Sequence, residues 1–154
     1  MNPAPDLHAQ SQRLVDFFQA LSPRTLQNLG DFYSPDAFFK DPYQEVRGLA
    51  PIGRVFAHMY EVLDEPRFVI VDQLASRSPE GVVQCFFNWD FHFRFKRFQP
   101  QQAQWIHGSS HLKLTPAGLV HYHRDYWDTS EEVYEKLPLL GSLMRWLKKQ
   151  ARAA

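Results

Sequence analysis

The sequence contains very little cysteine and no excess of charge of either sign. Its 154 residues include one cysteine, Cys85, which excludes an internal disulfide and a metal site built from four thiolates. The 17 basic and 17 acidic residues balance, which argues against a protein that binds nucleic acid through a basic surface. We therefore expect no nucleic-acid partner, and the single thiol suits a reducing compartment such as the cytoplasm.

Long apolar runs and glycine-rich loops are also missing. No apolar run reaches the roughly 20 residues of a membrane-spanning helix, and the first residues lack the basic head and apolar stretch of a signal peptide. We therefore expect a cytoplasmic protein without a membrane span. The seven glycines form no phosphate-binding loop, so no organic cofactor is expected.

Apolar and aromatic residues are abundant, at 44% and 15% of the chain. Together with the length of 154 residues, this composition predicts one compact domain with its own core. We expect residues 1–154 to form a single domain, in which residues 129–154 are a C-terminal helical extension.

Hydrophobic periodicity places helices in the first part of the chain. Apolar residues recur at helical spacing in residues 8–21, and Ser22-Pro23 reads as the N-cap and first position of a second helix. Pro51 is predicted to open a third helix. Between these segments the prolines favour extended backbone, which predicts a short strand about residues 37–40 followed by a loop.

After Pro66 the period changes from that of a helix to that of a strand. Strands are predicted over residues 68–74, 82–98, 103–115 and 119–128, and the second of these alternates aromatic with polar side chains. Short turns favour antiparallel pairing of neighbouring strands. Helices and strands are thus segregated along the chain, which predicts the α+β class.

The C-terminal segment predicts a basic, amphipathic helix. Thr129 and Glu132 have the spacing of a capping box, and Pro138 interrupts the helix that starts there. Such a helix can lie on an anionic membrane surface, or cover the sheet, a partner subunit or a pocket mouth. Its apolar stripe and the cations beside it are Leu140, Leu143, Met144 and Leu147, with Arg145, Lys148, Lys149 and Arg152.

Two groups of residues carry a family resemblance. The first contains Tyr33, Asp36 and Phe38, then Asp41-Pro42, then Gly48 and Ile52; the second contains Gly118-Leu119-Val120 and the run from His123 to Asp128. In order and spacing they resemble the nuclear transport factor 2-like superfamily, in particular its SnoaL-like and ketosteroid-isomerase-like branches, over roughly residues 10–128. The resemblance implies a cone, in which a curved, mostly antiparallel sheet wraps the N-terminal helices and encloses a pocket. Dimers are common in this superfamily.

The resemblance implies a general base at Asp41, where isomerases of this family place a carboxylate on the pocket wall. The alternative is that Asp41 only begins the turn before Pro42, a position that favours Asp. Those isomerases also use a tyrosine and a protonated carboxylic acid as an oxyanion hole. Leu14 and Ser110 stand at the matching positions, so a ketosteroid isomerase is excluded.

Asp125 matches the acidic residue that acts as acid and base in SnoaL-like cyclases. Strand alternation predicts that His121, His123, Asp125 and Trp127 share one face, and the family pattern turns this face into the cone. His123 and Asp125 are then a candidate acid/base pair opposite Asp41. The alternative is a polar network that only satisfies its own hydrogen bonds. His121 and His123 also have the His-x-His spacing of a metal site, for which Asp125 and Asp41 could supply a third ligand. Because nothing in the sequence shows that these side chains converge, no metal is expected.

An apolar lining completes the predicted site. Alternation turns one aromatic face of the sheet inward, and Phe38 is expected to join it from the helical side. The alternative is that these side chains fill the cone as a solid core. The predicted substrate-binding residues are Ser110, Trp89, Phe91, Phe56, Met59, Leu112, Trp127 and His121.

These expectations leave two functions open. One is a SnoaL-like isomerase, cyclase or hydratase that binds an apolar, ring-shaped or polyketide-like molecule. Asp41 or Asp125 would be its base, His123 the partner and Ser110 a minor donor. The other is a non-catalytic, dimeric ligand-binding or protein-interaction module. In either case, polar and aromatic residues on the outer sheet face predict a homodimer, and a solvated sheet is the alternative.

Overall fold

The structure is a computed structural model that describes residues 6–97, 99–132 and 138–152. Its N-terminal part contains helix α1 (Leu7–Gln19), the 3₁₀ helix η1 (Thr25–Asp31) and helix α2 (Leu49–Val62). The three predicted helices are confirmed, with two corrections. The third, α2, begins at Leu49, two residues before Pro51, which was predicted to open it. The second, η1, starts two residues after Pro23 and is a 3₁₀ helix, because Asn28 has non-helical backbone angles that prevent a regular α-helix.

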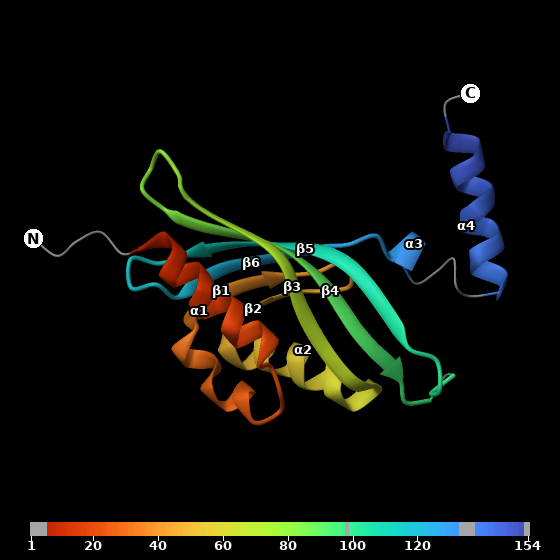
Figure 1. Cartoon of the computed structure of the whole chain (residues 1–154), viewed down its shortest axis with the longest axis horizontal. Helices are drawn as coiled ribbons and strands as arrows, with labels where there is room; N and C mark the ends of the chain where they lie inside the picture. The colour runs from red at the N-terminus through yellow and green to blue at the C-terminus, as the bar shows by residue number, and fades with distance from the viewer. Residues whose placement is uncertain (1–5, 98, 133–137, 153–154) are drawn as a thin grey trace, which may run out of the picture.

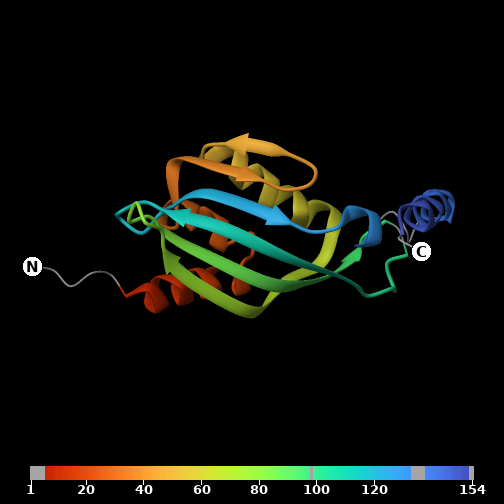
Figure 2. The same ribbon diagram turned by 90° about the horizontal axis from the view of Figure 1, so that it is seen from above.

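Six strands form one sheet in the order β2-β1-β6-β5-β4-β3. Neighbours pair antiparallel, except that β1 and β6 run parallel. The helices α1 and α2 lie on one face of the curved sheet, and α3 (Thr129–Glu132) and α4 (Pro138–Ala151) follow β6 at one end of the molecule (Figures 1 and 2). The predicted α+β class is confirmed. The strands are β1 (Tyr33–Lys40), β2 (Glu45–Arg47), β3 (Leu63–Arg77), β4 (Val83–Phe95), β5 (Gln104–Leu114) and β6 (Val120–Tyr126).

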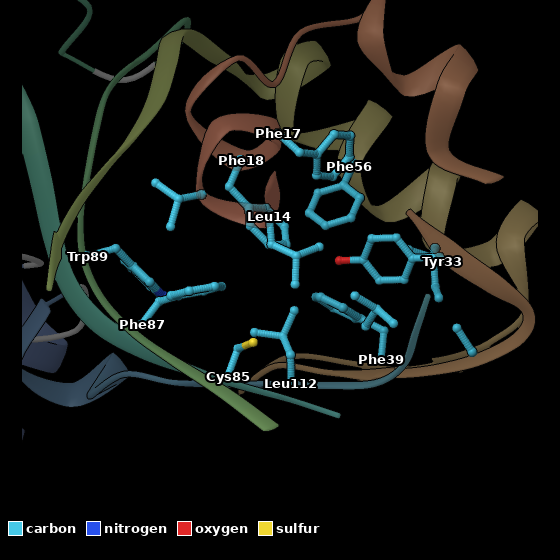
Figure 3. Packing of buried hydrophobic residues seen from close by; sticks show 14 of the residues in the cluster. Leu14, Phe17, Phe18, Tyr33, Phe39, Phe56, Cys85, Phe87, Trp89 and Leu112 are labelled. Carbon is cyan, nitrogen blue, oxygen red and sulfur yellow. The ribbon is translucent and has the colours of Figure 1, made fainter. Parts of the chain in front are cut away.

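The core lies between the helices and the concave face of the sheet. The alternation predicted for β4 is confirmed, because Phe87, Trp89, Phe91 and Phe93 are buried while Asn88 is exposed. In Figure 3 aromatic and aliphatic side chains from the helices meet those from the strands in one continuous cluster. The removal of these apolar side chains from water is the main source of folding free energy.

Several strands differ from their predicted extents. Strand β1 begins at Tyr33, four residues earlier than predicted, and β4 ends at Phe95, three residues earlier. Residues 45–47, expected to be part of a loop, form β2, which pairs with β1 and is joined to it by an ion pair of 2.8 Å between Lys40 and Glu45. Strand β3 begins at Leu63 and so runs through Pro66. The proline is tolerated because it falls where the register with β4 shifts, between Asp64 and Arg67, and a bulge needs no ladder hydrogen bond there.

The expectation that Phe38 faces the pocket is wrong. Phe39 is the buried residue, and Phe38 lies on the other face, where its ring stacks on Tyr122 of β6 at 5.4 Å between centroids. Two consecutive phenylalanines on a strand must point to opposite faces, and the sequence alone did not decide which one faces inward.

The alternation predicted along β6 does not hold at His121. The register with β5 shifts between Val120 and Tyr122, so His121 is the extra residue of a bulge. As a result Val120 and His123 are both buried although they are three residues apart. Beyond the bulge, His123 and Asp125 resume the regular pattern.

Candidate functional site

A pocket of about 360 Å³ opens between the concave face of the sheet and α2. Its wall is mostly aromatic and aliphatic, as small-molecule sites are. The polar residues in the wall are Asp41, Tyr43, Gln44, His58 and Asp125. The apolar ones are Phe39, Val55, Phe56, Met59, Val62, Leu63, Phe68, Trp89, Phe91, Phe93, Phe95, Ile106 and Trp127.

Asp125 is held in this wall by two hydrogen bonds to the same oxygen. Its Oδ1 accepts from Ser110 Oγ at 2.5 Å and from His123 Nε2 at 2.8 Å. Ser110 is its direct cross-strand neighbour on β5, and His123 precedes it by two residues on β6. Both donors thus bind one oxygen of a carboxylate whose residue lines the pocket.

Trp89 extends this network on the β4 side. Its indole Nε1 donates to Ser110 Oγ at 2.8 Å, so the serine hydroxyl is directed onward to Asp125. The indole lies against Gly108, its cross-strand neighbour, where a Cβ would stand only 2.3 Å from the ring. Glycine at position 108 therefore makes the room that this indole needs.

Tyr33 extends the network on the other side. The hydroxyl of Tyr33 lies 2.6 Å from His123 Nδ1. Burial, and to a lesser extent the charge of Asp125, raise the pKa of Tyr33 well above its usual value, so the phenol keeps its proton and donates to Nδ1. With Nε2 of His123 placed to donate to the Asp125 carboxylate, Nδ1 is the ring nitrogen placed to accept the Tyr33 hydroxyl proton.

Aromatic rings hold the imidazole of His123 in position. The ring centroids of Phe18, Phe39 and Tyr33 lie 4.9–6.0 Å from the centroid of the imidazole. The whole His123 residue is only 2% exposed. Tyr33 and Phe39 also appear in Figure 3, inside the buried cluster. The network of Tyr33, His123, Asp125, Ser110 and Trp89, called the polar chain below, thus runs through the core and reaches the pocket at Asp125 and Trp89.

Asp41 also lines the pocket, but its carboxylate is engaged in the turn between β1 and β2. Its Oδ1 accepts from the backbone N–H groups of Tyr43 and Gln44, both at 2.8 Å, and its Oδ2 accepts from the side chain of Gln44 at 3.0 Å. This is the bonding of an aspartate that shapes a turn, which was the alternative to its role as a base.

The predicted lining residues divide into two groups. Trp89, Phe91, Phe56, Met59 and Trp127 line the pocket. By contrast, Ser110 lies behind the wall in the polar chain, Leu112 is fully buried in the core, and His121 sits at the β6 bulge; none of the three lines this pocket.

Tyr33 is the member of the polar chain that the sequence did not assign to the site. It entered only as part of the family resemblance, because its partner His123 lies 90 residues away. One signal was present: a buried tyrosine needs a partner for its hydroxyl, and a buried histidine is a common one.

Two further properties concern the part of the chain that the structure describes. In that part, no three His, Cys, Asp or Glu side chains converge as they do around a metal ion. No helix within the same residues is long and apolar enough to cross a membrane.

The sequence was also compared with those of known proteins. The model of the SnoaL-like domain matches residues 14–123. No curated protein gives a significant match.

Solved structures share the fold at low sequence identity. An epoxide hydrolase of M. tuberculosis, described as LEH-like, is 13% identical with a TM-score of 0.67, over 94% of this chain and 99% of that one. A Catenulispora acidiphila protein with a ketosteroid isomerase-like fold, in complex with trimethylamine, is 14% identical with a TM-score of 0.64 (88% and 96%). A candidate SnoaL-like polyketide cyclase of Shewanella putrefaciens is 22% identical with a TM-score of 0.60 (81% and 96%).

Proposed function

The chain belongs to the SnoaL-like domain family, and from this premise we propose that it is an enzyme that moves a proton on an apolar, ring-shaped small molecule. Asp125 is the proposed base, His123 and Ser110 position it, and Tyr33 and Trp89 position those two in turn. The reaction class is isomerisation, cyclisation or hydration. The observation that carries the proposal is the polar chain that ends on an aspartate in an apolar pocket.

The bonding of Asp125 suits a base. A carboxylate oxygen can accept the two hydrogen bonds found on Oδ1, and Oδ2, which neither of these donors uses, is the atom proposed to take the proton. The side chain is only 14% exposed, so the transfer takes place with little competing water. A carboxylate without such donors in an apolar wall would be costly to keep charged.

The proposed step removes a proton from a carbon next to a carbonyl group. The C–H bond breaks, its proton goes to Asp125 Oδ2, and its electron pair forms the enolate of the substrate. Return of the same proton to another carbon of a conjugated enolate moves the double bond and gives an isomer. Attack of the enolate carbon on a second carbonyl carbon forms a C–C bond and an alkoxide, which takes the proton from Asp125 Oδ2, so that a ring with a hydroxyl group results. In each case Asp125 ends as the carboxylate from which it began.

Solvent deuterium exchange tests this step without knowledge of the natural substrate. A panel of cyclic ketones and diketones is incubated with the protein in D₂O, and loss of the α-proton signal is followed by NMR. We expect catalysed exchange for at least one member, and a decrease of about 100- to 10,000-fold in the Asp125→Asn variant. Binding of the same ketone, followed by thermal shift, should survive this substitution.

The second function left open by the sequence is distinguished by the same assay. If ketones bind and stabilise the protein but exchange is no faster than in buffer, the pocket is a binding site and the acid/base proposal is wrong. Loss of binding in Trp127→Ala, which shortens the apolar wall, is expected under either function, and loss of catalysed exchange accompanies it only if the protein is an enzyme.

We also propose a homodimer that forms through the outer face of the sheet. Large apolar side chains are exposed on this face, and exposed apolar patches of this kind mark protein interfaces. They include Val69, Val71, Leu74, Phe86, Trp105 and Tyr126. The face also carries a row of contacting rings from β4 to β1: Phe86 stacks on His111, His111 meets Tyr122 edge to face, and Tyr122 stacks on Phe38. A second copy of the chain offers the same aromatic surface, as an interface with twofold symmetry requires.

A further inference from the structure

Helix α4 projects from the end of the molecule instead of lying on its own sheet (Figures 1 and 2). Its contacts include an ion pair of 3.6 Å between Lys148 and Glu131 of α3. Three large apolar side chains on it remain exposed: Leu143 at 49%, Trp146 at 57% and Leu147 at 45%. The Leu140 side chain, also predicted for this stripe, lies outside the described residues. An apolar face of this size is stabilised when it is removed from water.

The basic residues of α4 gather on one side of the helix. At 3.6 residues per turn, Leu143, Trp146 and Leu147 fall on one side, and Arg145 and Lys149 fall on the opposite side together with Lys148 and Arg152. Residues 138–154 contain four basic and no acidic residues, a charge of +4. Residues 1–137 contain the other 13 basic and all 17 acidic residues, a charge of −4.

We propose that α4 binds the surface of an anionic lipid bilayer. The apolar side would enter the boundary between headgroups and acyl chains, and the cations would reach the lipid phosphates. A helix that docks on a protein needs only its apolar side, whereas α4 adds cations without a single anion. Trp146 lies at the border between the two sides, which is where tryptophan is favoured at a membrane interface. This inference does not depend on the proposed acid/base chemistry.

Helix α4 lies at the same end of the molecule as several residues that line the pocket. The C-terminal ends of α2, β4 and β6 lie at the same end of the molecule as α4 (Figure 1). They carry Val62 and Phe95, and Trp127 follows β6; all three line the pocket. A helix anchored on a bilayer would therefore hold the apolar pocket close to the membrane surface, where apolar molecules are concentrated.

Vesicle co-sedimentation of the full chain tests the proposal. Vesicles of phosphatidylcholine with about one third phosphatidylglycerol are compared with vesicles of phosphatidylcholine alone. We expect binding to the anionic vesicles, weakened at high salt because the attraction is screened. Each cation near such a surface contributes about fivefold to the partition coefficient. The double variant Arg145→Gln/Lys149→Gln should therefore lower it about 25-fold.

The matched control removes the same charge from the body of the protein. Arg24→Gln/Arg54→Gln changes two exposed residues, one in the turn before η1 and one in α2, and should leave the partition coefficient within about twofold of the wild type. Equal binding to neutral vesicles, an equal effect of both double variants, or no binding to either vesicle would overturn the proposal. So would a Leu143→Glu variant that lowers the sedimentation mass, because α4 would then cover a second copy of the chain.

Discussion

Asp125 and Asp41 line the same pocket but differ in what their oxygens do. Asp41 accepts three hydrogen bonds over both of its oxygens, from groups in its own turn. Asp125 accepts two bonds on one oxygen, from side chains on two different strands. The first arrangement shapes the chain locally, while the second holds a carboxylate that the sheet delivers to the pocket. This contrast is why we assign the base to Asp125.

His111, on the outer face, should make stability depend on pH. Burial, and secondly the charge of Lys113, lower the pKa of His111, whose Nε2 lies 2.8 Å from Gln84 Oε1. Below the ordinary histidine value of about 6.5, the unfolded chain therefore binds more protons at this site than the folded chain. The contribution of neutral His111 is complete above that pH and is lost as the pH falls through the window below it.

Urea unfolding at pH 7.5 and pH 5.0, at one protein concentration, measures this effect. The free energy of unfolding of the wild type should fall more between the two values than that of His111→Gln, which keeps an amide beside Gln84. Equal losses in the two proteins would show that His111 is not stabilised as a neutral group.

Gly108 affects the candidate site through its contact with Trp89. A Cβ at this position would collide with the Trp89 ring, and both residues lie on the inward face of adjacent strands. Gly108→Ala should therefore displace the indole, weaken its bond to Ser110 and lower the free energy of unfolding by about 1–3 kcal/mol through overpacking. Thermal-shift binding of the best ketone should weaken as well.

The matched control for this substitution is Gly81→Ala, in the turn before β4. A Cβ there meets no atom within 4 Å, although the positive φ of 86° disfavours alanine. Gly81→Ala should lower stability without changing ligand binding. A Gly108→Ala protein that binds ligand as the wild type does would contradict the role given to Trp89.

Elements with a strong local pattern could be predicted from the sequence, and elements defined by long-range pairing could not. Helix α1 and strand β4 show clear 3.6- and 2-residue periods because each has one buried side. Strand β2 has three residues and exists only by pairing with β1. The bulge at His121 arises from the register with β5, which no local pattern reveals.

In the candidate site, too, local contacts could be predicted from the sequence and long-range contacts could not. His123 and Asp125 could be paired because they lie two residues apart on one strand. The bond from Ser110 depends on the β5–β6 register, and the bond from Tyr33 spans 90 residues, so neither could be read locally. Phe38 and Phe39 show the limit most directly, because consecutive aromatic residues give no sign of which one is buried.

The whole molecule has an exposed apolar sheet face, which gives the proposed homodimer a direct test. The double variant Leu74→Glu/Phe86→Glu places two charges at a cross-strand pair on this face. Sedimentation velocity should show a dimer for the wild type and a monomer for this variant. The control Leu143→Glu/Leu147→Glu on α4 should remain dimeric. A monomeric wild type at all accessible concentrations would contradict the interface.

The central claim is that Asp125, and not Asp41, is the base of the pocket. The most direct measurement compares deuterium exchange of one bound ketone in Asp125→Asn and Asp41→Asn, at saturating ligand and equal folded fraction. We predict a decrease of at least about 100-fold for Asp125→Asn and less than about threefold for Asp41→Asn, because an asparagine at position 41 keeps an oxygen for the turn. Full exchange activity in Asp125→Asn, or its loss only in Asp41→Asn, would contradict the account.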